Sequence, residues 1–154
     1  MQPDVTRLVF MKPRLREHTV TTWARLVRTE TTLIDRVQKA LKAAKLPPLG
    51  WYDVLLELKR APGGELRQYE IGAQTLLTKY NLSRLVDRLQ REGLVERHAC
   101  AEDGRGNLVR ITAAGVELLQ RMWPVYGAVL EQQFESRLSA DEILALDNIL
   151  QKLD

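Results

Sequence analysis

The order of sequence patterns between Leu66 and Gly115 restricts the fold of this chain more than any other feature. Apolar residues first recur at helical spacing in two short segments, and two segments of alternating apolar and polar residues follow them. Gly93 separates the helical from the alternating segments, and glycine is a common left-handed stop after a helix. The expected elements are helices over about 68–75 and 79–92 and strands over 94–98 and 108–112. This order predicts a helix-turn-helix followed by a β-hairpin, the wing of a winged helix.

The second helix of this pair has the clearest amphipathic pattern. Four apolar residues at the spacing i, i+3, i+4 and i+7 are expected to face the core: Leu82, Leu85, Val86 and Leu89. In the first helix, Ile71 is expected to be buried, as is Leu66 just before that helix. Thr78 is expected to be the N-cap of the second helix, because its hydroxyl can accept a hydrogen bond from the first turn.

Two further helices are expected before this region. Periodic apolar residues predict a long helix over about 15–45, which ends because Pro47 and Pro48 cannot continue it. A shorter helix is expected over about 49–60. Residues 65–67 are interpreted only as the approach to the next helix.

Two helices are also expected after the wing. Thr112 can cap a helix that runs to about Arg137, with a kink at Pro124. Ser139 and Glu142 have the spacing of a capping box at the start of a last amphipathic helix. The predicted fold class is therefore mainly α with a small β-hairpin wing, that is, a winged helix-turn-helix plus a helical dimerisation region.

The dimerisation region is inferred from the helices that a winged helix does not need. A winged helix-turn-helix DNA-binding domain requires only about residues 49–112. The segments 1–48 and 113–154 carry long helices with broad apolar faces, and so small a domain could not cover these faces from solvent. We expect the same helices of a second copy to cover them in a two-fold homodimer. The alternative is that they fold back onto their own winged core in a monomer.

The chain carries a formal net charge of +3 that is unevenly distributed along its 154 residues. Residues 1–60 contain 12 basic and 6 acidic residues, whereas residues 111–154 contain 3 and 7. A nucleic acid would therefore be bound by a few placed Arg and Lys residues rather than by a polycationic surface. No apolar segment is long enough to cross a bilayer and no signal peptide is recognisable, so we expect a cytoplasmic protein without a membrane partner.

Cysteine and histidine are too few to build a disulfide framework or a zinc site. Cys100 is the single cysteine, and the two histidines are His18 and His98. We therefore expect neither a metal nor a cofactor. The acidic neighbours Glu102 and Asp103 would raise the pKa of a thiol, so Cys100 is expected to have no redox role.

Polar residues of the segment 78–88 are suited to contacts with double-stranded DNA. Asn81 can form a bidentate pair with adenine and Arg84 with guanine, each giving about 1–3 kcal/mol of discrimination. Lys79 and Arg88 are better placed for phosphates, which add affinity without sequence information. The alternative for each is an ordinary solvated residue on a helix face. The candidate DNA-binding residues here are Thr78, Lys79, Tyr80, Asn81, Ser83, Arg84 and Arg88.

The tip of the wing offers one further candidate contact. Arg105 lies between Gly104 and Gly106, where backbone freedom lets a long side chain project toward a narrow minor groove. Asp103 could hold that guanidinium in a short-range ion pair. The alternative is an ordinary turn with an incidental charge. In a dimer, two such units with reading helices about 34–36 Å apart would meet successive major grooves of a palindromic operator.

Together these segments resemble the MarR (multiple antibiotic resistance regulator) family of bacterial winged helix transcription factors over nearly the whole chain. The resemblance rests on LPPLGWYDVLLEL, APGGELR, LSRLVDRLQREGLVER, EDGRGNLVRITAAG and LSADEILAL. It implies a homodimeric repressor or activator whose DNA affinity responds to a small molecule or to thiol oxidation. By this resemblance the DNA contacts fall on Thr78–Arg84 and on Arg105. The family often has a second wing arginine, for which Arg110 on the returning strand is a poor substitute.

The resemblance also implies a small-molecule effector, often an aromatic or phenolic anion, between the dimerisation helices and the winged core. The residues expected to border that crevice are His18, Trp23, Trp51 and Tyr52. A histidine can neutralise an anion near neutral pH. The alternative is that the tryptophans pack in the core or in the dimer interface and that His18 is merely exposed.

The function expected from the sequence is a sequence-specific DNA-binding transcriptional regulator, in the form of a homodimeric repressor under the control of a ligand. The alternative is a winged helix protein-interaction module without specific DNA binding, with the basic first helix as its docking face. An enzyme is not expected, because the sequence offers no nucleophile with a recognisable base and no glycine-rich phosphate loop.

Overall fold

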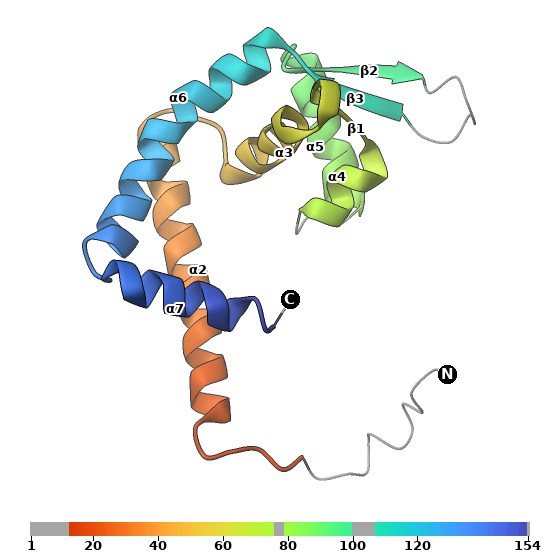
Figure 1. The fold of residues 1–154 in the computed structure, drawn as a ribbon. Helices are drawn as coiled ribbons and strands as arrows, with labels where there is room; N and C mark the ends of the chain where they lie inside the picture. Colours follow the sequence, from red (N-terminus) through yellow and green to blue (C-terminus); the bar gives the residue numbers. More distant parts are fainter. Residues whose placement is uncertain (1–12, 76–78, 100–106, 154) are drawn as a thin grey trace, which may run out of the picture. The chain divides into compact units, whose positions relative to one another are not determined.

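The structure of the chain is a computed structural model that describes residues 13–75, 79–99 and 107–153 (Figure 1). The chain divides into two compact units, residues 1–34 and 35–154. In the described ranges, no helix is both long and apolar enough to cross a membrane. The helices are α2 (Thr19–Ala43), α3 (Leu49–Arg60), α4 (Gln68–Gln74), α5 (Lys79–Arg91), α6 (Ala113–Leu130) and α7 (Ala140–Leu150). The strands are β1 (Glu65–Arg67), β2 (Val95–Ala99) and β3 (Asn107–Ile111).

The sheet has three antiparallel strands in the order β1-β3-β2, so the wing is larger than the hairpin expected from the sequence. Glu65 pairs with Arg110 on β3, and Arg110 pairs in turn with Glu96 on β2. The interpretation of residues 65–67 as a helix approach was therefore wrong. Three residues are too few to show a period of two, and only pairing with the outer edge of β3 makes them a strand.

The predicted helices are present, with small differences at their ends. The helix α3 begins and ends where the sequence placed it, whereas α2 begins at Thr19 rather than near residue 15 and ends at Ala43. The two wing strands are displaced by one residue from the expected ranges. These are differences of hydrogen bonding at element ends, where fraying and turn geometry decide the last paired residue.

The core lies in the second unit, where α3, α4, α5 and the first half of α6 pack against one another and against β3. Leu82, Val86 and Leu89 are buried as predicted, and Ile71 is fully buried. Leu85 and Leu66 are only half-buried, so their predicted burial was too strong. The other buried apolar residues of this core are Val37, Leu41, Leu49, Tyr52, Val54, Leu55, Leu58, Leu94, Val95, Val109, Leu118, Leu119 and Met122.

Two predicted helix signals are confirmed around α6. Gly93 has φ of 70°, a left-handed conformation that a residue with a side chain rarely adopts, and it separates α5 from β2. Thr112 is the N-cap of α6, because its Oγ1 accepts a hydrogen bond from the Gly115 amide at 3.2 Å. Thr112 Oγ1 also donates to the Gly93 carbonyl at 2.7 Å, so the cap ties the two ends of the wing together.

The C-terminal helices differ from the sequence prediction in one respect. The expected continuous helix to Arg137 instead gives way after Leu130 to a π-helical segment, η2, over Glu131–Glu135. The predicted capping box at α7 is confirmed, because Ser139 Oγ accepts from the Glu142 amide and a Glu142 carboxylate oxygen accepts from the Ser139 amide. A change from α to π hydrogen bonding inserts one residue in a turn, which the apolar period does not reveal.

Candidate nucleic-acid interface

Helix α5 has a buried apolar side and an exposed polar side. Leu82, Val86 and Leu89, each at most 2% exposed, fasten it to the core. Asn81, Arg84 and Arg88 are exposed at the spacing i, i+3 and i+7, which places them on one face, and Ser83 beside them is half-buried. The helix therefore presents amide and guanidinium groups, the side chains best suited to read base edges and phosphates in a major groove.

Several predicted DNA contacts cannot be placed. Thr78, Asp103 and Arg105 lie outside the described residues. Lys79 and Tyr80 form the first residues of α5, but nothing is described of their side chains. The two wing strands are described up to the Ala99–Asn107 pair, from which the segment with Arg105 continues. The roles of these five residues stay predictions.

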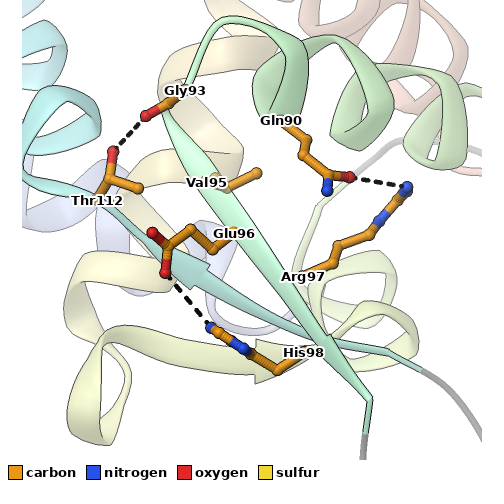
Figure 2. A pocket seen from close by; sticks show the side chains of 7 residues that line it. All are labelled: Gln90, Gly93, Val95, Glu96, Arg97, His98 and Thr112. Carbon is orange, nitrogen blue, oxygen red and sulfur yellow. Dashed lines mark hydrogen bonds and ion pairs between the residues drawn. The ribbon is translucent and has the colours of Figure 1, made fainter.

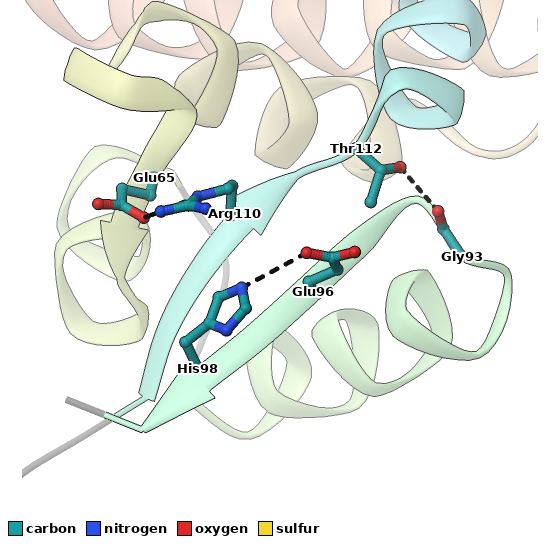
Figure 3. A network of polar contacts seen from close by, with 6 residues as sticks. All are labelled: Glu65, Gly93, Glu96, His98, Arg110 and Thr112. Carbon is teal, nitrogen blue, oxygen red and sulfur yellow. Dashed lines mark hydrogen bonds and ion pairs between the residues drawn. The ribbon is translucent and has the colours of Figure 1, made fainter. Parts of the chain in front are cut away.

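Arg110 is held within the sheet by a carboxylate on the neighbouring strand (Figure 3). Its Nε and Nη2 both donate to Glu65 Oε2, at 2.9 and 2.6 Å. Next to it on this face lie Glu96 and His98 of β2, whose Oε2 and Nε2 atoms are 3.4 Å apart. Arg110 is thus committed to joining β1 and β3, which gives a physical reason why it is a poor replacement for a second wing arginine.

Arg97 was not among the residues predicted from the sequence, yet it links its own strand, β2, to the two helices α4 and α5. Its Nη1 donates to Asp87 Oδ1 at 2.5 Å and to Gln90 Oε1 at 3.3 Å, both on α5. Its Nη2 donates to Gln68 Oε1 on α4 at 3.4 Å. One signal was available: in the alternation of 94–98, Arg97 falls on the same side of the strand as Val95, and that side faces the core.

A shallow hollow of about 460 Å³ lies beside β2, and the two faces of the strand contribute different chemistry to it (Figure 2). On one side of the strand Arg97 reaches Gln90, and on the other His98 reaches Glu96. The lining is polar and open to solvent. Among the described residues, no group of three or more His, Cys, Asp or Glu side chains could hold a metal ion.

The predicted ligand residues Trp51 and Tyr52 both lie on α3. Tyr52 is buried and packs against two aromatic rings of α6, with centroid distances of 6.4 Å to Trp123 and 5.2 Å to Tyr126. Trp51 is half-buried beside the core. The contact of Trp123 and Tyr126 with Tyr52 depends on the packing of α3 against α6, which a local sequence pattern does not show.

An acidic group adjoins this aromatic cluster of Tyr52, Trp123 and Tyr126. Burial raises the pKa of the Asp53 carboxyl, and the nearby Glu57 raises it further. The pKa of the Tyr126 phenol is raised mainly by burial and then by the Asp53 charge, so the two groups lie within electrostatic reach. Burial also raises the pKa of the Tyr52 phenol, while the Arg60 charge lowers that pKa and the Asp53 charge raises it, so charges of both signs act on Tyr52.

The other two predicted ligand residues, His18 and Trp23, belong to the first unit. His18 is exposed in the turn before α2, and its carbonyl accepts a hydrogen bond from the Thr22 amide at 2.8 Å. Trp23 is 66% exposed on α2. The prediction that these residues border a ligand crevice stays a prediction.

Comparisons with known proteins identify the domain built around this interface. Residues 45–106 match the model described as the MarR family. The chain carries a MarR-family domain. It is also 36% identical over 72 residues to the multiple antibiotic resistance protein MarR of Escherichia coli strain K12, a match that covers 47% of this chain. The chain therefore spans about half, 50%, of the length of this curated relative.

Solved structures extend the likeness over nearly the whole chain. One is Sco3205, a MarR family transcriptional regulator from Streptomyces coelicolor in complex with DNA, with a TM-score of 0.84 and 26% identity. The likeness covers 94% of this chain and 90% of the Sco3205 chain. Another is wild-type apo MarR from E. coli, with a TM-score of 0.68, 25% identity, and coverage of 84% of this chain and 95% of that one. The predicted winged helix fold is thereby confirmed, including the helices on both sides of the 45–106 segment. The family and these neighbours are transcriptional regulators rather than enzymes.

Proposed function

We propose that this chain is a sequence-specific transcriptional regulator that binds a palindromic operator in double-stranded DNA as a homodimer and represses transcription. The observation that carries the proposal is the exposed face of α5, where Asn81, Arg84 and Arg88 lie together while the opposite face is anchored in the core. The DNA complex of the Streptomyces coelicolor neighbour supports it, because that regulator shares the fold over 94% of this chain.

The homodimer accounts for apolar side chains that a single chain leaves in water. In the first unit α2 exposes Val20, Trp23, Leu26 and Val27, between 38% and 66%. In the second unit α7 and the turn after it expose Leu144, Ile149, Leu150 and Leu153, between 39% and 70%. We propose that segments 1–48 and 113–154 form the dimerisation region and that residues 49–112 form the DNA-binding domain. Sedimentation velocity should give a dimer at micromolar concentration; a monomer would contradict this part of the proposal.

The effector is proposed to be a small aromatic molecule that weakens operator binding. Trp51 and Tyr52 would contact its ring, and His18 and Trp23 are the proposed contacts from the first unit. Because the Arg60 and Asp53 charges act on Tyr52 with opposite signs, the surroundings of Tyr52 do not by themselves select an anionic or an uncharged ligand. A panel of aromatic acids and their neutral amides, added to an operator-binding assay, distinguishes a charged from an uncharged requirement.

The central test is the selection of bound sites from random DNA by the purified chain. We expect an inverted repeat whose half-sites are about 10 base pairs apart, the spacing of successive major grooves on one side of the duplex. Failure to enrich any sequence, with retained binding at low salt, would contradict sequence-specific recognition.

Arg84→Ala and Arg88→Ala form a matched pair, because each removes one arginine from the same face of α5. Arg84→Ala is expected to lower the affinity for the selected site by about 10-fold to 100-fold more than the affinity for random DNA, because it would remove a bidentate base contact. Arg88→Ala should lower the affinity for both DNAs equally and reduce the salt dependence of binding, because it would remove a phosphate contact. Equal losses on the two DNAs for Arg84→Ala would remove its role as a base reader.

A further inference from the structure

We propose that Arg97 is a positioning residue that sets the rotation of α5 relative to the wing, and thereby the selectivity of the interface, without itself touching DNA. The inference rests on the proposed function, since it assigns a role within DNA recognition. It concerns the inner face of the sheet, whereas Asn81, Arg84 and Arg88 lie on the exposed side of α5.

The position of Arg97 in β2 directs its side chain inward. Its partner across the sheet is Val109, which is fully buried, and the Arg97 side chain is only 20% exposed. The guanidinium lies between β2 and the two helices of the helix-turn-helix, where it reaches Asp87 and Gln90 on α5 and Gln68 on α4. A group enclosed in this way is poorly placed to reach a phosphate or a base.

The apolar contacts of α5 leave a geometrical freedom that this guanidinium removes. Leu82, Val86 and Leu89 hold the helix against the core, but apolar burial has no preferred direction and tolerates rotation about the helix axis. A charge-assisted hydrogen bond does have a direction. Asp87 lies three residues after Arg84 and one before Arg88, so fixing Asp87 fixes the angle at which both arginines leave the helix.

Stability alone does not account for the arrangement. The Arg97 side chain is 20% exposed, and removing its guanidinium from water costs desolvation that the attraction to the half-exposed Asp87 carboxylate often only offsets. Among the described residues, the buried Nε of Arg97 has no hydrogen-bond acceptor, and an unsatisfied buried donor is unfavourable. A costly group that joins three elements is better explained by the geometry it imposes, because base contacts require placement within about 0.5 Å.

The sheet supplies a matched control in Arg110. Arg110 also forms an ion pair with a carboxylate, Glu65, at 2.6 Å, but that pair joins β1 to β3 and does not reach α5. Arg97→Met and Arg110→Met each remove one positive charge from a wing strand and keep an unbranched apolar side chain. Any general effect of the lost charge on the attraction of DNA should therefore be the same in both variants. An effect on the position of α5 should occur only in Arg97→Met.

The experiment compares affinities for the selected operator and for random DNA, at one salt concentration and with the folded fraction of each variant measured. Arg97→Met is expected to lower the ratio of operator to random affinity by about tenfold, and Arg110→Met to leave the ratio within about twofold. Adding Asp87→Asn to Arg97→Met should change the ratio little further, because the two substitutions break the same link. Equal ratios for Arg97→Met and Arg110→Met would overturn the inference.

Hydrogen exchange of the free protein separates this inference from the proposed function. Arg97→Met should speed exchange of the α5 amides relative to those of α3, and Arg110→Met should not. If the wild type selects no operator, the proposed function fails, and the exchange data still decide whether Arg97 holds α5. If the wild type selects an operator but exchange and selectivity are unchanged in Arg97→Met, the positioning role fails and the function stands.

Discussion

Substitution of Gly115 by alanine provides the most direct test of how the wing is joined to α6. Gly115 is buried in the first turn of α6. A Cβ atom there would lie 2.4 Å from the Leu94 carbonyl oxygen, 2.7 Å from Ile111 Cγ1 and 3.3 Å from Leu55 Cδ2. The first of these contacts is with backbone, which cannot turn aside as the end of a flexible side chain can. The Leu94 carbonyl is also the acceptor for the Thr112 amide at 3.0 Å.

Two opposite effects set the expected magnitude. Alanine is a better helix former than glycine by about 0.8–1.0 kcal/mol, which would stabilise the variant. Overpacking of a tight contact costs about 1–3 kcal/mol, and a weakened buried backbone hydrogen bond adds about 1 kcal/mol or more. The overpacking should win because the helix cannot shift away without breaking the Thr112 cap. We expect a net loss of about 2 kcal/mol in the free energy of unfolding, or a fall in Tm of about 4–8 °C.

The assay is urea unfolding followed by circular dichroism, at one protein concentration because the proposed dimer would make the transition concentration-dependent. Gly127→Ala is the matched control, since it lies in the same helix and its Cβ would be 3.4 Å from the Trp123 ring, an ordinary contact. The control should be as stable as the wild type or up to about 1 kcal/mol more stable. The reasoning would be refuted if Gly115→Ala were also unchanged or stabilised.

Two further predictions concern the carboxyl beside the aromatic cluster and the cap of α7. Burial, and then the charge of Glu57, raise the pKa of Asp53 above its ordinary value of 3.8. Above the raised pKa of the folded state, the charged carboxylate therefore lowers the free energy of unfolding. This destabilisation disappears as the pH falls below 3.8. Asp53→Asn should therefore unfold at higher urea than the wild type at pH 7, with a difference that shrinks toward acid pH; a pH-independent difference would contradict the assignment. Ser139→Ala removes the acceptor of the Glu142 amide and should cost about 1 kcal/mol in urea unfolding. Its control is Ser136→Ala, whose hydroxyl only donates back to the Gln132 carbonyl, and equal losses in the two variants would argue against the cap.

The candidate interface shows where sequence reasoning stops. The exposed row on α5 could be predicted, because Leu82, Val86 and Leu89 define the buried side and leave Asn81, Arg84 and Arg88 opposite. The link from Arg97 to Asp87 could not, because ten residues separate the two and their contact depends on how β2 crosses α5. The alternation within 94–98 indicated an inward side chain but not its partner.

What the sequence determined by itself was local: the helical periods, the glycine stop at Gly93, the caps at Thr112 and Ser139, and the pattern typical of the MarR family. Each of these signals depends on residues that are close in the sequence, because the capping, turn and periodicity effects act over one or two turns of chain. Only the tertiary structure decided that Glu65–Arg67 forms a third strand, that Tyr52 meets Trp123 and Tyr126, and that Gly115 must lack a side chain against Leu94. Each of these depends on segments far apart in the chain being packed together, and the positions of such contacts are set by three-dimensional packing rather than by any local period.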